Sequence, residues 1–163
     1  MKHFLLFLLL MTQLTANAQS GKATTVKKTF SRTTSVSIEI MATPATIWSL
    51  LTNAEQFPQW NSTVISIEGS IEEGNKIKLK STLDPSRTFK LKVKEMLKEE
   101  KMIWGDAMGK RTYTLSPSGK GVLFSMTEKI GGPIFPLFAN KIPSFDESFE
   151  QFAADLKKAA ENR

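Results

Sequence analysis

Apolar residues near the C-terminus recur at steps of three and four, the spacing of one face of an α-helix. Pro143 interrupts this apolar stripe, and a proline inside a helix removes a backbone donor and clashes with the preceding turn. We therefore expect a kink, or two pieces that meet near Ile142. Ser144 and Glu147 have the spacing of a capping box, so the longer piece is expected to begin at Ser144. The stripe consists of Phe138, Ile142, Phe145, Phe149, Phe152 and Leu156.

Most of the chain upstream alternates between apolar and polar residues, the period of a half-buried β-strand. Thr43 and Pro44 are suited to begin a short helix after the first strand, and a second helical turn ends at Pro58. The pattern predicts an α+β fold, in which a seven-stranded antiparallel sheet packs against the long C-terminal helix. The expected strands lie near residues 36–40, 65–67, 77–79, 89–93, 102–104, 111–115 and 122–126.

The N-terminus is typical of a secretory signal peptide. Lys2 precedes an unbroken apolar run over residues 4–11, and Ala16 to Ala18 supply the small residues of a cleavage site. The apolar run is shorter than the roughly 20 residues that a membrane-spanning helix needs. We expect residues 1–18 to be removed and the protein to be exported, either periplasmic or secreted. Residues 19–32 are expected to be a flexible lead-in to a single domain at 33–163.

The composition excludes several kinds of chemistry. The chain has no cysteine and one histidine, His3, which lies in the expected signal peptide. The mature chain therefore lacks disulfides, Ser-His-Asp and Cys-His catalytic groups, and nearly all usual zinc ligands. No metal-ligand spacing or glycine-rich phosphate loop is visible, so neither a metal nor a cofactor is predicted. The net charge of +6 is moderately basic and identifies no partner by itself.

Several short motifs stand in a recognisable order. Phe57 to Asn61 reads Phe-Pro-Gln-Trp-Asn, glycines follow at 69 and 74, and Glu128 lies shortly before Gly131-Gly132-Pro133. Together with Ile38-Glu39-Ile40 and Thr43-Pro44-Ala45, these motifs resemble the SRPBCC superfamily of START, polyketide cyclase and birch-pollen-allergen-like proteins. The resemblance implies a helix-grip fold, in which a curved sheet wraps the C-terminal helix and leaves a cavity. Members bind lipids, sterols, polyketides and other apolar molecules, and some catalyse cyclisation or dehydration.

Arg111 and Glu128 are the strongest polar candidates. Similar sequences of the cyclase-like subgroup often have a histidine where this chain has Arg111, so their acid–base chemistry is not carried over. A hairpin closed by residues 116–121 would place Arg111 opposite Met126, with Glu128 one diagonal step away. Arg111 and Glu128, with Tyr113 nearby, would then hold the polar end of an apolar ligand. The alternative is a structural ion pair at the sheet margin.

An apolar set supplies the other candidates for the pocket wall. The alternative for each is a place in the core, to which Phe149, Phe152 and Leu156 are assigned outright. Residues before Pro143 are favoured for the cavity, because the kink should lift that segment from the sheet. The apolar candidates are Trp60, Phe89, Trp104, Tyr113, Phe124, Met126, Phe135, Phe138 and Ile142.

Two predicted neighbouring strands carry lysines on their outer faces. Like charges placed directly opposite each other destabilise a sheet, so an anionic membrane surface or polyanion is one candidate partner. The alternative is a solvated face relieved by nearby glutamates. Nucleic acid is not predicted as a partner, because an exported protein is not expected to meet it. The aromatic residues of these strands also lie on the face opposite to the lysines. The lysines are Lys76, Lys78, Lys80, Lys90, Lys92 and Lys94.

Three function classes follow. The leading prediction is an exported binding or carrier protein for a lipid-like or polyketide-like molecule, without covalent chemistry. The second is a cyclase-like or dehydratase-like enzyme that uses Glu128 with Arg111 or Tyr113. The third is an envelope interaction protein that works through its lysine face, and this class predicts a pocket too small for any ligand.

Overall fold

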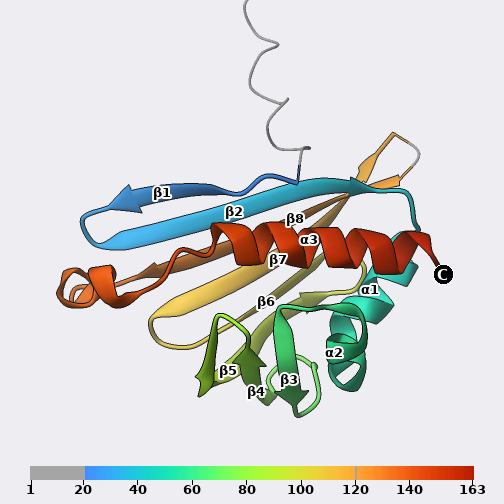
Figure 1. Ribbon diagram of the computed structural model, residues 1–163. Coiled ribbons are helices and arrows are strands. Elements are labelled where there is room, and N and C mark those ends of the chain that lie inside the picture. Colours follow the sequence, from blue (N-terminus) through green and yellow to red (C-terminus); the bar gives the residue numbers. More distant parts are fainter. Residues whose placement is uncertain (1–20, 120) are drawn as a thin grey trace, which may run out of the picture.

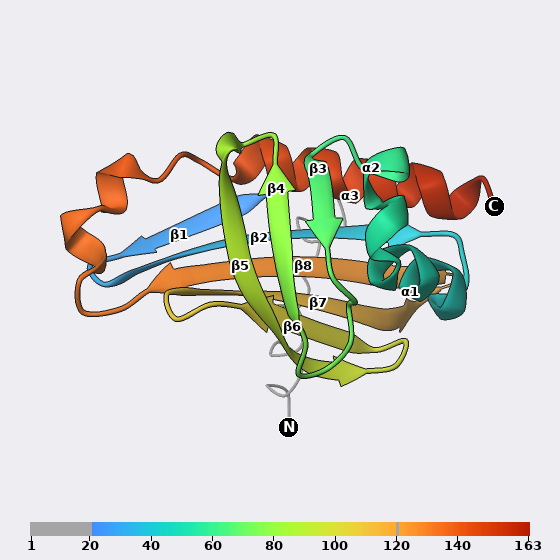
Figure 2. The ribbon, with the colours of Figure 1, turned by 90° about the horizontal axis from the view of Figure 1, so that it is seen from below.

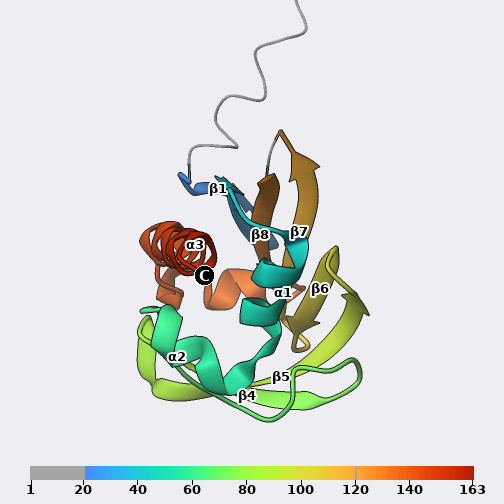
Figure 3. The same ribbon diagram turned by 90° about the vertical axis from the view of Figure 1, so that its right-hand side faces the viewer.

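The computed structural model describes residues 21–119 and 121–163, and these form an eight-stranded antiparallel sheet in the order β1-β2-β8-β7-β6-β5-β4-β3. The sheet curves around the C-terminal helix, which lies along its concave face (Figures 1 and 3). This arrangement is a helix-grip fold of the α+β class, as the sequence predicts. The strands are β1 Thr24–Lys28, β2 Ser31–Ile40, β3 Val64–Glu68, β4 Lys76–Ser81, β5 Asp84–Leu97, β6 Lys101–Gly105, β7 Gly109–Ser118 and β8 Gly121–Gly131.

Short helices occupy the connection between β2 and β3. At the start of the first, the side chain of Thr43 accepts a hydrogen bond from the backbone N–H of Thr46, and Pro44 follows as the first helical residue. The helices close one end of the sheet (Figure 2). The helical elements are α1 Pro44–Thr52, η1 Ala54–Gln56, α2 Phe57–Trp60, η2 Phe135–Leu137, η3 Ala139–Lys141 and α3 Asp146–Glu161.

The C-terminal segment is divided at Pro143, as predicted. Ile142 has an extended backbone, which is the conformation that a following proline favours. Before it, the chain forms two 3₁₀ turns rather than an α-helix. The predicted capping box at Ser144 is wrong: α3 begins at Asp146, and the Ser144 hydroxyl instead accepts a bond from the Asp146 N–H at 3.3 Å.

The predicted flexible lead-in and the predicted strand count need correction. Most of the described part of residues 19–32 is strand, since β1 pairs with β2 over Thr24 to Lys28 and makes the sheet eight-stranded instead of seven-stranded. Glu150 of α3 accepts bonds from the Ala23 N–H and from Lys22. The polar composition of β1 fits an edge strand, which buries little apolar surface.

The predicted register of the β7–β8 hairpin is wrong by two residues. Arg111 lies directly opposite Glu128, Tyr113 opposite Met126, and Leu115 opposite Phe124. The ladder continues to the pair Ser118 and Gly121, so the turn is tighter than the predicted one. Because the shift is even, every side chain keeps its predicted face.

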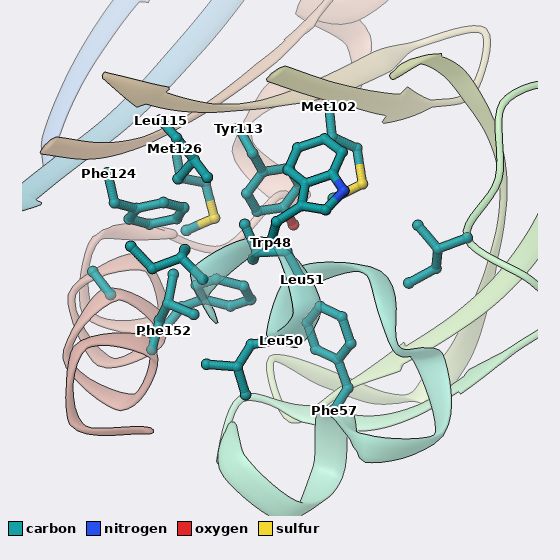
Figure 4. Packing of buried hydrophobic residues seen from close by; sticks show 14 of the residues in the cluster. Trp48, Leu50, Leu51, Phe57, Met102, Tyr113, Leu115, Phe124, Met126 and Phe152 are labelled. Atoms are coloured by element: carbon teal, nitrogen blue, oxygen red, sulfur yellow. The ribbon is translucent and has the colours of Figure 1, made fainter. Parts of the chain in front are cut away.

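The core fills the space between the sheet, α1, α2 and the second half of α3. Tyr113, Phe124 and Met126 from the sheet meet Phe57 and Phe152 from the helices (Figure 4). The ring of Phe152 lies 6.3 Å from that of Phe124 and 5.9 Å from that of Tyr113. This aromatic cluster closes one half of the sheet against solvent.

The predicted signal peptide at residues 1–18 lies outside the described residues. Within the described part of the chain, no helix is both long and apolar enough to cross a bilayer.

Candidate functional site

A cavity of about 540 Å³ lies between the sheet and the segment that leads into α3. Leu79, Phe89 and Leu91 of β4 and β5 line one wall. Phe138 and Phe149 line the opposite wall, one on each side of the division at Pro143. The lining is mainly apolar, and the volume is within the range of small-molecule sites.

Arg32 of β2 fixes the chain that covers the cavity. Its guanidinium donates to the carbonyl oxygens of Ile142 and Pro143 at 3.1 and 2.7 Å, and lies 4.7 Å from the ring of Phe145. These bonds satisfy two carbonyls that the divided helix leaves without helical partners. Burial lowers the pKa of Arg32, and Asp146 opposes that change. Arg32 stays cationic, because an arginine pKa begins far above neutrality.

The charged pair in the cavity wall is Arg111 and Glu128. The Nε of Arg111 donates to a carboxylate oxygen of Glu128 at 2.5 Å, and the two side chains are 20% and 15% exposed. The guanidinium also lies 5.1 Å from the ring of Phe149. Since an arginine has five N–H donors and Nε uses one on Glu128, the terminal nitrogens can serve a ligand oxygen.

Tyr113 lies beside this pair on the core side. Burial lowers the pKa of Arg111, but the Glu128 carboxylate outweighs it, so the pKa is raised. Burial also raises the pKa of Tyr113, and Arg111 opposes this more weakly, so the phenol stays protonated. The Tyr113 hydroxyl and the Trp60 indole N–H are the buried side-chain polar atoms, among the described residues, without a partner of normal hydrogen-bond geometry. Arg111 therefore acts on Tyr113 through its charge.

The open side of the cavity carries exposed charges. Arg87, Asp106 and Lys141 line it and are exposed, and the Arg87 guanidinium lies 4.6 Å from the ring of Phe89. Charge is therefore concentrated at the mouth and at the Arg111–Glu128 pair. A ligand with an apolar body and at least one polar end matches this distribution.

The structure divides the predicted pocket residues into two groups. Phe89, Trp104, Arg111, Glu128, Phe138 and Ile142 line the cavity. The others pack elsewhere: four of them lie in the aromatic core cluster around Phe152, and Phe135 packs against Phe138 with ring centroids 5.6 Å apart. Those residues are Trp60, Tyr113, Phe124, Met126 and Phe135.

Sequence reasoning missed several residues of the site. Phe149 was expected in the core alone, but its ring both packs there and lines the cavity. The cavity is also lined by Leu79, Leu91 and Ile130. The alternation along their strands shows that such residues face inward, but it does not show which of them border a void. Arg32 lies in the segment that the sequence predicts to be flexible, but it belongs to β2. An arginine inside a run of serine and threonine just before a predicted strand was the available signal.

The predicted lysine face is present. Lys76 lies opposite Lys92 and Lys78 opposite Lys90 across β4 and β5. Lys78 pairs with Glu68 at 3.0 Å, and Lys94 donates to the carbonyl oxygen of Asp106 at 2.8 Å. The repulsion is thus partly relieved within the protein, as the solvated alternative expects.

No cluster of acidic or histidine side chains suited to a metal ion occurs among the residues that the structure describes.

The family whose description is polyketide cyclase / dehydrase and lipid transport matches residues 31–161. The chain belongs to this family. The match covers the sheet from β2 onward, the cavity and α3, and the domain is of the SRPBCC type. By sequence, no curated protein matches the chain.

Solved structures share the family fold at low sequence identity. A conserved protein of unknown function from Enterococcus faecalis is 18% identical over 86% of this chain and 77% of that one, with a TM-score of 0.61. A START superfamily protein from Mycobacterium smegmatis is 17% identical over 80% and 97%, with a TM-score of 0.59. A protein from Mesorhizobium loti is 18% identical over 80% and 98%, with a TM-score of 0.63. The family description supports a hydrophobic ligand-binding or cyclase-like domain, and these neighbours show that the fold is shared.

Proposed function

We propose that the protein binds or carries an apolar small molecule, lipid-like or polyketide-like, inside the cavity. The observation that carries the proposal is a cavity of about 540 Å³ whose mainly apolar wall ends at the Arg111–Glu128 pair. Burying a ligand there removes apolar surface from water, and about 25 cal/mol is gained per Å² removed. The guanidinium fixes the ligand's polar end and so sets its orientation.

The proposal includes export. A positive residue, a short apolar run and small residues before Gln19 support removal of a signal peptide. The intact mass of the protein, isolated from the cell envelope or medium, is expected to correspond to a chain that begins at Gln19. A full-length chain recovered from the cytoplasm would overturn this part.

Mass spectrometry under native conditions tests the binding. Protein isolated from its own compartment is expected to carry a co-purified apolar molecule that denaturation releases. Nile red should bind to emptied protein, and Leu91→Trp, which fills the cavity, should reduce that binding. Leu97→Trp is the matched control, because Leu97 is 48% exposed and lies outside the cavity lining. Absence of both a co-purified molecule and Nile red binding would refute the proposal.

A second candidate is a cyclase-like or dehydratase-like enzyme. The observation that favours it is the Glu128 carboxylate, which lines the cavity and is mostly removed from water. There it can accept a proton from a bound substrate, while Arg111 stabilises negative charge on a neighbouring oxygen. Glu128→Gln decides between the two functions. An enzyme would keep ligand affinity and lose turnover, whereas a carrier would show no turnover in either form.

The cavity argues against the third class. An envelope interaction protein that works only through its lysine face predicts no space for a ligand, and the space is present.

A further inference from the structure

One end of the molecule gathers exposed apolar side chains around the cavity mouth. Phe30 and Ile134 are each 58% exposed, Leu137 is 81% exposed, and Met108 is 38% exposed. We call these four residues the apolar rim. Met108 and Ile134 also line the cavity, so the rim is continuous with the proposed ligand site.

The rim is assembled from three segments that are distant in sequence. The Gly132 N–H donates to the Phe30 carbonyl at 3.0 Å, and the Gly131 N–H donates to the Met108 carbonyl at 2.9 Å. The β1–β2 turn, the β6–β7 turn and the chain after β8 are thereby joined. They lie together at the left end of Figures 1 and 2, opposite the C-terminus.

Lysines surround the apolar rim. Lys110 and Lys129 are exposed and directly opposite each other across β7 and β8. Together with Phe30 and Met108 they line a shallow hollow beside the cavity mouth. Lys28 and Lys141 are also exposed at this end.

The acidic residue beside the rim is Asp106, which is engaged with the backbone. Its carboxylate accepts bonds from the N–H groups of Met108 and Gly109, each at 2.8 Å. It shapes the β6–β7 turn and offsets one of the surrounding positive charges. The surface therefore presents apolar tips within a positively charged ring.

We propose that the apolar rim docks on an anionic lipid bilayer, with Phe30 and Leu137 in the interface and the lysines on acidic headgroups. Interfacial binding grows with buried apolar area and with attraction to anionic lipid, and this end supplies both. The lysine face on β4 and β5 adjoins the rim at Lys94, which lines the same hollow, but Lys76 and Lys92 lie outside that hollow. Glu68 and the Asp106 carbonyl partly satisfy the charges of Lys78 and Lys94. Docking through the rim points the cavity mouth at the membrane.

A vesicle assay tests the docking, and it does not require the proposed ligand. The protein is sedimented with phosphatidylcholine vesicles and with vesicles that contain phosphatidylglycerol. Binding is expected only to the anionic vesicles, and Phe30→Ser with Leu137→Ser should weaken it about tenfold. Lys110→Gln with Lys129→Gln should weaken it about fivefold per lysine at low salt.

Two controls separate the rim from other surfaces. Met41→Ser with Leu97→Ser removes two apolar side chains outside the rim that are 52% and 48% exposed, and it should leave binding unchanged. Lys76→Gln with Lys92→Gln removes an equal charge from the lysine face. All variants keep the same N-terminal segment, so differences between them report on the rim. A larger loss from the lysine-face variant than from the rim variants would overturn the proposal.

A fluorescence signal that increases on binding keeps the proposal testable even when the serine and glutamine variants fail to fold. The chain has three tryptophans, Trp48, Trp60 and Trp104, and none lies in the rim. Leu137→Trp should therefore show new emission that shifts to the blue with anionic vesicles and is quenched by brominated lipid. Met41→Trp should show neither change. Quenching at Met41→Trp alone would show that the rim is not a membrane surface. The other candidate occupant of the rim is a second copy of the chain: a dimer in solution that the rim substitutions abolish, with no vesicle binding, would also overturn the proposal.

Discussion

The space between the sheet and the C-terminal segment has two halves that differ in one respect. In the packed half, under Phe152 and Leu156, the helices α1 and α2 supply the side chains that fill it. In the hollow half, under Phe138 and Phe149, the covering chain consists of two 3₁₀ turns, an extended residue before Pro143 and only the first turn of α3. Both halves have apolar walls, so composition does not distinguish them. What distinguishes them is whether a second layer of helix reaches the sheet.

The largest expected difference between the halves is in large-to-small substitutions. Phe152→Ala should lower the free energy of unfolding by about 4 kcal/mol, because it opens a void in a filled region. Phe138→Ala should cost less than about 1 kcal/mol, since its ring already borders a void and is half-buried. Urea unfolding of both variants measures this, and equal losses would contradict the division into halves.

Removal of Arg111 should have the next largest effect. Arg111→Met leaves the Glu128 carboxylate in a poorly hydrated wall and should cost about 2 kcal/mol of stability. Arg111→Met combined with Glu128→Met should recover part of this loss. Lys78→Met is the matched control, because the Lys78–Glu68 pair is exposed, and it should cost less than about 0.5 kcal/mol. Similar unfolding curves for Arg111→Met and Lys78→Met would show that the cavity wall is as well hydrated as the protein surface.

The two halves should also differ in how well they accept a larger side chain. Leu115→Trp in the packed half should cost about 2 kcal/mol, because its side chain has no space to enter. Leu91→Trp should change stability by less than about 0.5 kcal/mol, since the added ring enters the cavity. Thermal unfolding gives both values, and a destabilised Leu91→Trp would mean that the hollow half cannot accommodate a ligand-sized group.

The smallest expected effect lies at Glu150, which joins α3 to the chain before β1. The Ala23 N–H and Lys22 lower the pKa of Glu150, so its contribution to stability is present above its ordinary pKa and is lost as pH falls through the folded-state value. Glu150→Gln should slightly reduce stability at neutral pH and should flatten its decline in acid. Unfolding midpoints measured from neutral pH down to about pH 3 test this, and an unchanged acid decline would exclude the contact.

The sequence predicted most of the fold because strand and helix periods are local properties. Seven of the strands were placed, and the pattern also showed that Pro143 divides the C-terminal segment. β1 was missed because an edge strand of threonine and lysine lacks the apolar alternation that marks a buried one. The Arg111–Glu128 pair was found despite a wrong register, since an error of two residues preserves the face of each side chain.

The periodic pattern alone therefore determined which side chains face inward. The family motifs, and the prediction of a signal peptide, come from the same sequence. Only the tertiary structure decided which inward residues border a void and which fill the core. That outcome depends on how far the chain over residues 133–145 stands from the sheet. Arg32 sets this distance, because its guanidinium donates hydrogen bonds to two backbone carbonyl oxygens of that chain, at Ile142 and Pro143. Arg32 lies on a strand about 110 residues earlier in the sequence. A contact over that separation leaves no periodic trace in the sequence.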